Sequence, residues 1–201
     1  MCGRYYVDDE TAKAIERLVK EISGRNEINR LREMKNGDIH PSDEAPVLIA
    51  KGNHVEAAWQ RWGFPGFQGK GLVFNARSET VLEKNMFRNS ILHRRSVVPC
   101  TWFYEWNKNK EKVTFQRKEE PVMFLAGFYN YYGEDQRFVI LTTEADEVMA
   151  PVHDRMPLIL NADQIEKWIL DDKEFQPMMR ERSSLPVPLK VRQDYEQLKL
   201  F

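Results

Sequence analysis

Residues 121–145 read PVMFLAGFYNYYGEDQRFVILTTEA, and this stretch decides the class of fold. It contains two apolar runs, 121–132 and 136–145, joined by the short connection GED. A third run with strand character, KVTFQRK at 112–118, comes shortly before them. Runs of this length with hairpin-like spacing predict three strands of an antiparallel sheet.

Further strands and a few helices are predicted outward from this core. The predicted strands, in chain order, are 3–7, 47–50, 54–62, the start of 72–84, 96–106, the end of 148–161 and an extended tail at 184–191. The predicted helices are 8–22 with Asp8 or Asp9 as cap, the end of 72–84, 87–95, and 162–170 capped by Asn161. The spacing of Ala14, Ile15, Leu18, Val19 and Ile22 supports the first helix.

Two segments are predicted to be loops, and one strand is predicted to break. Residues 23–46 are polar and rich in turn formers, with one short helical piece, and the glycine-rich 63–71 is expected to lack regular structure. The strand 96–106 is expected to become irregular at Pro99. The pattern as a whole predicts an α+β fold: one domain over residues 1–201, with an antiparallel, barrel-like β-sheet core and flanking helices.

Composition narrows the setting of the protein. Of its 201 residues 42% are hydrophobic, enough for a real core, and the net charge of -1 means that any anion site must be a local patch. The two cysteines are far apart, which favours a reducing compartment over a disulfide framework. No signal peptide and no apolar run of about 18 residues is seen, so we expect a cytoplasmic protein without a membrane partner. Nothing suggests an obligate oligomer, and we expect a monomer.

Cys2 has an unusual position. If Met1 is removed, Cys2 carries a thiol and a free α-amine, and both are partly deprotonated near neutral pH. The amine can form a Schiff base with an aldehyde, after which the thiolate can close a thiazolidine ring. Alternatively, either group can act as an acyl-transfer nucleophile. The small neighbour Gly3 allows a partner to approach closely, although a cysteine at the start of a strand can also be a simple packing residue.

Three further segments carry candidate functional groups. Asn75, Arg77, Ser78 and Glu79 follow an apolar run and can hold a sugar and a phosphate, or can form an ordinary helix start. Glu105 lies among aromatic residues, where a carboxyl group would have a raised pKa suited to acid–base work. The same aromatic residues can instead fill the core, and Cys100 is expected to be a packing residue.

His153 lies between two prolines and is a candidate proton shuttle, with the alternative of an ordinary loop histidine. The remaining histidines lack ligand-like spacing, and no phosphate-binding or zinc-binding motif is present. We therefore expect no metal and no cofactor.

Taken together, MCGR, HPSDEAPV, RWGF, FNARSET, VPCTWFYEW and MAPVHDRMP occur in the order found in one family. The chain resembles the SOS response-associated peptidase (SRAP) family, also called abasic-site processing proteins, from Cys2 to about Leu160. The resemblance implies a covalent trap for abasic sites in single-stranded DNA. Cys2 would be the nucleophile, Asn75 would orient it, and Glu105 and His153 would handle protons.

The resemblance also implies a set of DNA contacts and one departure. The implied DNA-binding residues are Gly3, Arg4, Pro41, Phe67, Arg77, Ser78, Tyr104, Trp106, Thr142 and Arg155. Members of the family commonly show WGLIPxW where this chain has WGFPGF, so that one residue is missing and Phe67 replaces the final Trp.

Two other functions remain open at this level. Cys2 could serve an N-terminal-nucleophile amidase or peptidase, or the protein could bind single-stranded DNA without a covalent step by stacking bases on its aromatic residues. The resemblance to the SRAP family also implies three further activities: crosslink reversal, strand cleavage by β-elimination and release of the N-terminal residue.

Overall fold

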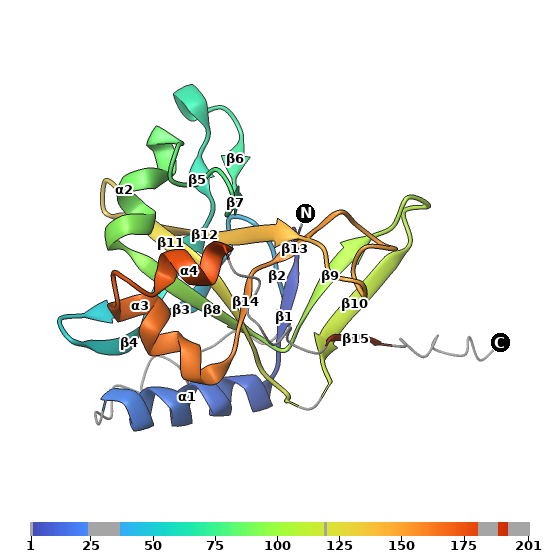
Figure 1. Cartoon of the computed structure of the whole chain (residues 1–201), viewed down its shortest axis with the longest axis horizontal. Coiled ribbons are helices and arrows are strands. Elements are labelled where there is room, and N and C mark those ends of the chain that lie inside the picture. The colour runs from blue at the N-terminus through green and yellow to red at the C-terminus, as the bar shows by residue number, and fades with distance from the viewer. Residues whose placement is uncertain (1, 24–36, 119, 181–188, 193–201) are drawn as a thin grey trace.

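A closed barrel forms the centre of the protein, as seen in a computed structural model that describes residues 2–23, 37–118, 120–180 and 189–192 (Figure 1). Its five strands follow one another around the barrel in the order β12, β4, β3, β8, β11 and back to β12. Their bounds are β3 Glu44–Lys51, β4 His54–Trp62, β8 Arg95–Cys100, β11 Met123–Tyr132 and β12 Asp135–Glu144. The barrel-like α+β fold is therefore confirmed.

The barrel closes through one parallel pairing. Neighbouring strands are antiparallel except for β12 and β4, where Arg137 pairs with Arg61 and Phe138 with Trp62. The core contains fully buried aromatic side chains, among them Trp62, Phe64, Phe128 and Phe138. At Gly127, a Cβ atom would lie 2.6 Å from the carbonyl oxygen of Val139, so only glycine lets β11 and β12 approach so closely.

Three short strands pair with β11 or β12 and extend the sheet of the barrel. They are β7 Asn75–Arg77, β13 Arg155–Pro157 and β14 Ile159–Leu160. β7 runs parallel to β12 and pairs Asn75 with Ile140 and Arg77 with Thr142, whereas β13 lies antiparallel to β12. The loop that carries His153 therefore leads into a strand bound to the same β12 that binds β7.

A second sheet lies beside the barrel and carries the start of the chain (Figure 1). Its order is β15, β10, β9, β1 and β2, with bounds β1 Tyr5–Val7, β2 Gly37–Ile39, β9 Trp102–Trp106, β10 Lys112–Arg117 and β15 Leu189–Arg192. The pairing of Tyr5 with Phe103 and of Tyr6 with Trp102 sets β1 against β9. A small hairpin of β5 Phe64–Pro65 and β6 Leu72–Val73 stands apart from both sheets and carries the short helix η2 Phe67–Gly69.

Helices cover the outside of the barrel. They are α1 Asp9–Ser23, α2 Asn85–His93, η3 Ala162–Gln164, α3 Ile165–Leu170 and α4 Phe175–Arg180. The predicted caps are confirmed: Asp8 Oδ1 accepts a hydrogen bond from the Thr11 backbone N–H at 2.8 Å, and Asn161 forms a capping box with Gln164.

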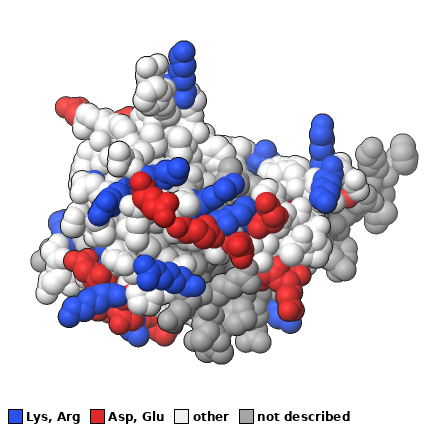
Figure 2. Space-filling model, turned by 45° about the horizontal axis from the view of Figure 1, so that its top comes forward, with Lys and Arg blue, Asp and Glu red and all other residues white. Residues whose placement is uncertain are grey.

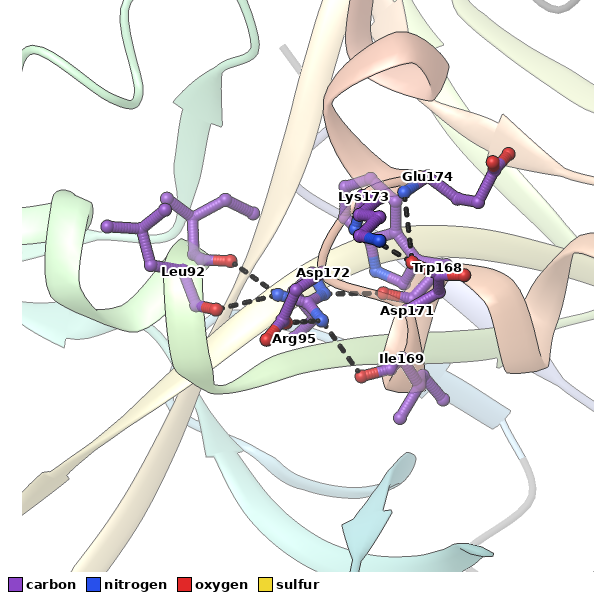
Figure 3. A network of polar contacts seen from close by, with 9 residues as sticks. Leu92, Arg95, Trp168, Ile169, Asp171, Asp172, Lys173 and Glu174 are labelled. Carbon is purple, nitrogen blue, oxygen red and sulfur yellow. Dashed lines mark hydrogen bonds and ion pairs between the residues drawn. The ribbon is translucent and has the colours of Figure 1, made fainter. Parts of the chain in front are cut away.

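One buried arginine ties two of these helices to the barrel (Figure 3). The guanidinium of Arg95 donates hydrogen bonds to the carbonyl oxygens of Leu92 at 2.7 Å and Trp168 at 2.6 Å. These carbonyls belong to the last turns of α2 and α3, where backbone acceptors lack partners within the helix. The same cation therefore caps both helix ends.

Several sequence-based expectations about local structure were wrong. Residues 78–83 form turns instead of a helix, because the backbone N–H of Ser78 still bonds to Thr142 O at 2.9 Å and holds the chain to β12. The segment 63–71 contains β5 and η2 and leads directly into β6, and β2 lies in the predicted loop 23–46. The short helical piece expected in that loop falls largely outside the described residues.

Two further differences concern Pro99 and the C-terminal region. Pro99 lies inside β8, and the chain bends at Thr101 instead. The pairing of β3 with β8 involves Val97 and Ser96, so the missing N–H of Pro99 breaks no hydrogen bond to β3. The helix α4 was not predicted. Of the predicted tail, residues 189–191 lie in β15, and the rest lies outside the described residues.

Candidate functional site

Cys2 lies just ahead of β1 and is completely buried. Its carbonyl oxygen accepts a hydrogen bond of 2.8 Å from Nδ2 of Asn75, which joins the start of the chain to β7. Its thiol lies 3.7 Å from the carbonyl oxygen of Arg4. Burial raises the pKa of the Cys2 thiol, and the nearby charge of Glu105 raises it further. In the chain that still carries Met1, the Cys2 thiol is therefore protonated.

Only one of the two polar side-chain atoms of Asn75 has a hydrogen-bond partner among the described residues. While Nδ2 holds Cys2, the buried Oδ1 has no hydrogen-bond partner among the described residues. A buried acceptor without a partner is unfavourable by about 1–3 kcal/mol and often marks a place where a ligand donates. The Oδ1 atom of Asn75 can therefore accept a hydrogen bond from a ligand that binds near Cys2.

Glu105 lies on β9 next to the start of β1. The backbone N–H of Tyr104 donates to Arg4 O at 3.0 Å. The pairing between the two strands therefore extends past Tyr5 toward Cys2 on one strand and toward Glu105 on the other. The carboxyl group is only 2% exposed, and burial raises its pKa, while the charge of His153 opposes that shift. Burial thus favours a protonated Glu105, which can act as an acid.

His153 makes two contacts with the same ring nitrogen. Its Nδ1 accepts a hydrogen bond of 3.0 Å from the backbone N–H of Arg155 and lies 2.9 Å from Oδ1 of Asp154. A neutral Nδ1 suits the first contact, whereas a protonated Nδ1 can donate to the second. Nδ1 of His153 is therefore held between a backbone donor and a carboxylate oxygen.

A group of basic and aromatic side chains surrounds the start of the chain. The guanidinium of Arg4 lies over the rings of Trp106 and Tyr104, with 5.3 and 5.9 Å to the ring centres. Trp106 is 36% exposed, and the ammonium group of Lys112 lies 4.8 Å from the ring centre of Tyr104. Such contacts are typical cation–π geometry, and they create a partly exposed cationic surface beside Cys2.

The remaining candidates fall into exposed and buried groups. Arg77 is exposed at the end of β7, Gly3 and Pro41 are partly exposed, and Phe67 is 80% exposed on the β5–β6 hairpin. By contrast, Ser78 and Thr142 are buried. Because no surface of Thr142 is accessible, we leave it out of the DNA interface that the sequence suggested.

Arg155 is also unlike the free phosphate ligand that the sequence suggested. It is 8% exposed and donates two hydrogen bonds to the carboxylate of Glu79, at 2.9 and 2.8 Å. A third bond of 2.8 Å reaches Thr142 O. Although burial opposes the shift, the bonds from Arg155 lower the pKa of Glu79. Arg155 therefore fixes the loop of His153 to β12 and to the turn after β7.

The surface around the site has mixed charge. Figure 2 shows a band of acidic side chains that crosses this face, with basic side chains on both sides of it. A cleft of about 510 Å³ is lined by Ser78, Glu79, Leu82, Glu83, Thr143, Glu144, Met179 and Arg180. Among the described side chains on this face, the acidic band therefore separates the basic groups from one another.

Sequence reasoning missed two residues at this site. Asp38 of β2 contacts both Arg4 and Tyr104, and Asp154 contacts His153. Asp154 directly follows His153 in the sequence but was given no role, whereas nothing in the sequence connects Asp38 to Tyr104. In the described parts of the chain, no group of three or more His, Cys, Asp or Glu residues could hold a metal ion, and no helix is long and apolar enough to cross a membrane.

These features define a barrel-centred α+β protein in which a cysteine at position 2 is held by an amide beside a buried carboxyl group, with an imidazole nearby. The model of the SOS response associated peptidase (SRAP) family matches residues 1–193, and the chain belongs to this family.

Similar proteins come from bacteria and a phage, among other sources. The chain is 31% identical over 163 residues to the abasic site processing protein YoaM of Bacillus subtilis, covering 74% of this chain and 71% of YoaM. It is 29% identical over 189 residues to YoqW of the same organism, which has the same description, covering 84% and 80% of the two chains. A crystal structure of a Bacteroides thetaiotaomicron protein matches with a TM-score of 0.74 at 24% identity, covering 89% of this chain and 86% of that one, which supports the fold alone.

Proposed function

We propose that the protein processes abasic sites in single-stranded DNA by forming a covalent crosslink through Cys2. One observation carries the proposal: the 2.8 Å hydrogen bond from Asn75 Nδ2 to Cys2 O, which holds the second residue of the chain beside the buried Glu105. The descriptions of YoaM and YoqW as abasic site processing proteins support the choice of substrate.

The proposed chemistry begins with removal of Met1. The ring-opened deoxyribose presents an aldehyde, and the freed α-amine of Cys2 adds to its carbon. Loss of water leaves an imine. The Cys2 sulfur then adds to the imine carbon while its proton moves to nitrogen, which closes a five-membered thiazolidine ring. The sum is aminothiol plus aldehyde giving thiazolidine plus one water, and no oxidant or metal takes part.

Glu105 and His153 are assigned to the proton transfers in this sequence. A protonated Glu105 can give a proton to the hydroxyl group that departs as water, and its carboxylate can take one from the attacking amine. Burial raises the pKa of Glu105, which favours the acid form at the start. His153, with its two alternative contacts at Nδ1, is assigned to proton transfer near the sugar.

Access to Cys2 sets a condition on this proposal. The residue is fully buried in the chain that still carries Met1. The proposal therefore requires that removal of Met1 uncovers the amine and thiol. The single strand would then be held by Arg4, Arg77, Phe67, Tyr104 and Trp106, with Gly3 and Pro41 lining its path. Ser78, Thr142 and Arg155 would support these residues from inside.

The test uses purified protein and a single-stranded oligonucleotide with one abasic site. Intact mass first establishes whether Met1 is absent, and a denaturing gel then detects a heat-stable shifted band. Cys2→Ala should abolish the band, and Cys2→Ser should leave only a labile imine. Cys100→Ala is the matched control, since it removes the other buried thiol and should crosslink normally. If Cys2→Ala crosslinks like wild type, the assigned nucleophile is wrong.

The same preparation separates this function from the alternatives. Hydrolysis of a peptide substrate without DNA would indicate an amidase or peptidase. Equal affinity for intact and abasic strands without a covalent product would indicate simple DNA binding. Recovery of free protein from the isolated crosslink, and strand breaks at the abasic site, would report reversal and β-elimination.

A further inference from the structure

Asp38 links two side chains that border the Cys2 site. It lies in β2, whose pairing with β1 places Asp38 opposite Tyr6. Its Oδ1 accepts a hydrogen bond of 3.0 Å from the hydroxyl group of Tyr104, and its Oδ2 accepts one of 3.5 Å from Nη1 of Arg4. Each carboxylate oxygen therefore holds one residue of the cationic surface.

Arg4 is only partly satisfied in this arrangement. Among the described residues, its side chain makes one hydrogen bond, the long contact to Asp38, and its buried Nε has no hydrogen-bond partner. The guanidinium also lies over the rings of Trp106 and Tyr104, which contributes cation–π attraction. Because guanidinium carries five N–H donors in a planar fork, several remain for an acceptor such as a phosphate.

A carboxylate in this position has a clear disadvantage for a DNA-binding protein. It repels phosphate, and it neutralises part of the charge of Arg4. With its side chain 37% exposed, Asp38 is not hidden from a strand that passes over Arg4. Its presence is understandable if the orientation that it imposes on Arg4 and Tyr104 matters more for the reaction than the attraction it removes.

We propose that Asp38 is a positioning residue, which holds Arg4 and Tyr104 so that Arg4 grips the phosphate next to the abasic sugar while Cys2 reacts. The inference rests on the proposed crosslinking function. It predicts a separation between binding and reaction that a purely structural residue would not produce. Loss of the Asp38 charge should leave DNA affinity unchanged or increased, yet it should slow the covalent step.

The experiment compares wild type with Asp38→Asn, in which the amide oxygen can still accept from Tyr104 but the charge that holds Arg4 is gone. Anisotropy with an intact single strand gives affinity, and single-turnover crosslinking at saturating abasic DNA gives the rate. We expect equal or tighter binding and a rate about tenfold lower, within the range of coupling energies for contacting residues. Glu134→Gln is the control, because it removes an exposed carboxylate from the β11–β12 turn and should leave the rate unchanged.

A double-mutant cycle identifies Arg4 as the residue through which Asp38 acts. In an Arg4→Gln background, Asp38→Asn should slow crosslinking no further, and Asp38→Glu in the wild-type background should restore part of the rate. Should Asp38→Asn fold poorly by circular dichroism, Tyr104→Phe, which removes one of the two bonds to Asp38, is expected to slow the reaction about threefold, within the same range of coupling energies.

The outcomes distinguish the two proposals. If wild type forms no crosslink, both the proposed function and the role of Asp38 are overturned. If wild type crosslinks and Asp38→Asn matches its rate, or if the variant loses affinity with an unchanged saturating rate, only the role of Asp38 is overturned.

Discussion

Replacing Arg95 by methionine should destabilise the protein strongly without changing the chemistry of Cys2. Arg95 is 4% exposed, and besides its short bonds to Leu92 O and Trp168 O it lies 3.4 Å from Ile91 O and 3.3 Å from Ile169 O. All four acceptors are in the last turns of α2 and α3 (Figure 3). Methionine fills similar space but offers these carbonyls no donor.

The expected loss follows from the two short hydrogen bonds. A bond to a charged donor contributes about 1.5–3 kcal/mol, and an unsatisfied buried acceptor is unfavourable by a similar amount. The ion pair with Asp172 at 2.6 Å adds little, because the Asp172 side chain is 76% exposed. We expect a loss of about 3–5 kcal/mol in the free energy of unfolding, which for a domain of this size lowers Tm by about 6–20 °C.

Thermal and urea denaturation, followed by circular dichroism, measure this loss. Arg88→Met is the matched control, since Arg88 lies on the exposed face of the same α2 and should change stability by no more than about 0.5 kcal/mol. Crosslinking by the folded Arg95→Met variant, assayed well below its Tm, should proceed at the wild-type rate. A loss below about 1 kcal/mol, or one equal to that of Arg88→Met, would refute the reasoning.

Three other substitutions test the site itself. Because burial raises the pKa of Glu105, wild type should lose stability relative to Glu105→Gln as pH rises from the ordinary carboxyl range near 4.5 toward neutral. Tm measured from pH 4 to 8 should show that the Gln variant is the more stable protein at the upper end, and parallel Tm curves would contradict this. The Gln variant should also crosslink more slowly than wild type. Asn75→Ala removes the bond to Cys2 O and should slow single-turnover crosslinking by about tenfold to a hundredfold, and an unchanged rate would remove Asn75 from the mechanism. Phe67→Ala should leave Tm unchanged, since Phe67 is 80% exposed, but lower the affinity for single strands by about fivefold or more in anisotropy, whereas the exposed Tyr131→Ala should not.

Local sequence patterns predicted most helices and strands of the described chain. The runs around 121–145 became β11 and β12, and Asp8 and Asn161 became helix caps as expected. These features depend on neighbouring residues, so they can be read from short stretches of sequence. The turn at 78–83 was mistaken for a helix because its conformation depends on β12, which lies far along the chain.

The residues of the site were recognised by type, while their surroundings were not. Glu105 among aromatic residues suggested a raised pKa, and the structure agrees in direction and cause. Arg155 and Thr142, by contrast, were expected at a DNA surface and are buried. Burial depends on what packs over a residue, and the sequence alone does not say that Glu79 meets Arg155 across 76 positions.

The sequence by itself determined the α+β class, the helix caps and the presence of a cysteine, an amide, a carboxyl group and an imidazole in recognisable motifs. Only the tertiary structure decided how they meet. The barrel closes through a parallel contact between β4 and β12, β7 binds the same β12, and Asn75 thereby reaches Cys2. Asp38 and Arg95 acquire their partners in the same way. Such contacts join segments that are distant in sequence, so their geometry follows from the packing of the whole chain and leaves no local pattern.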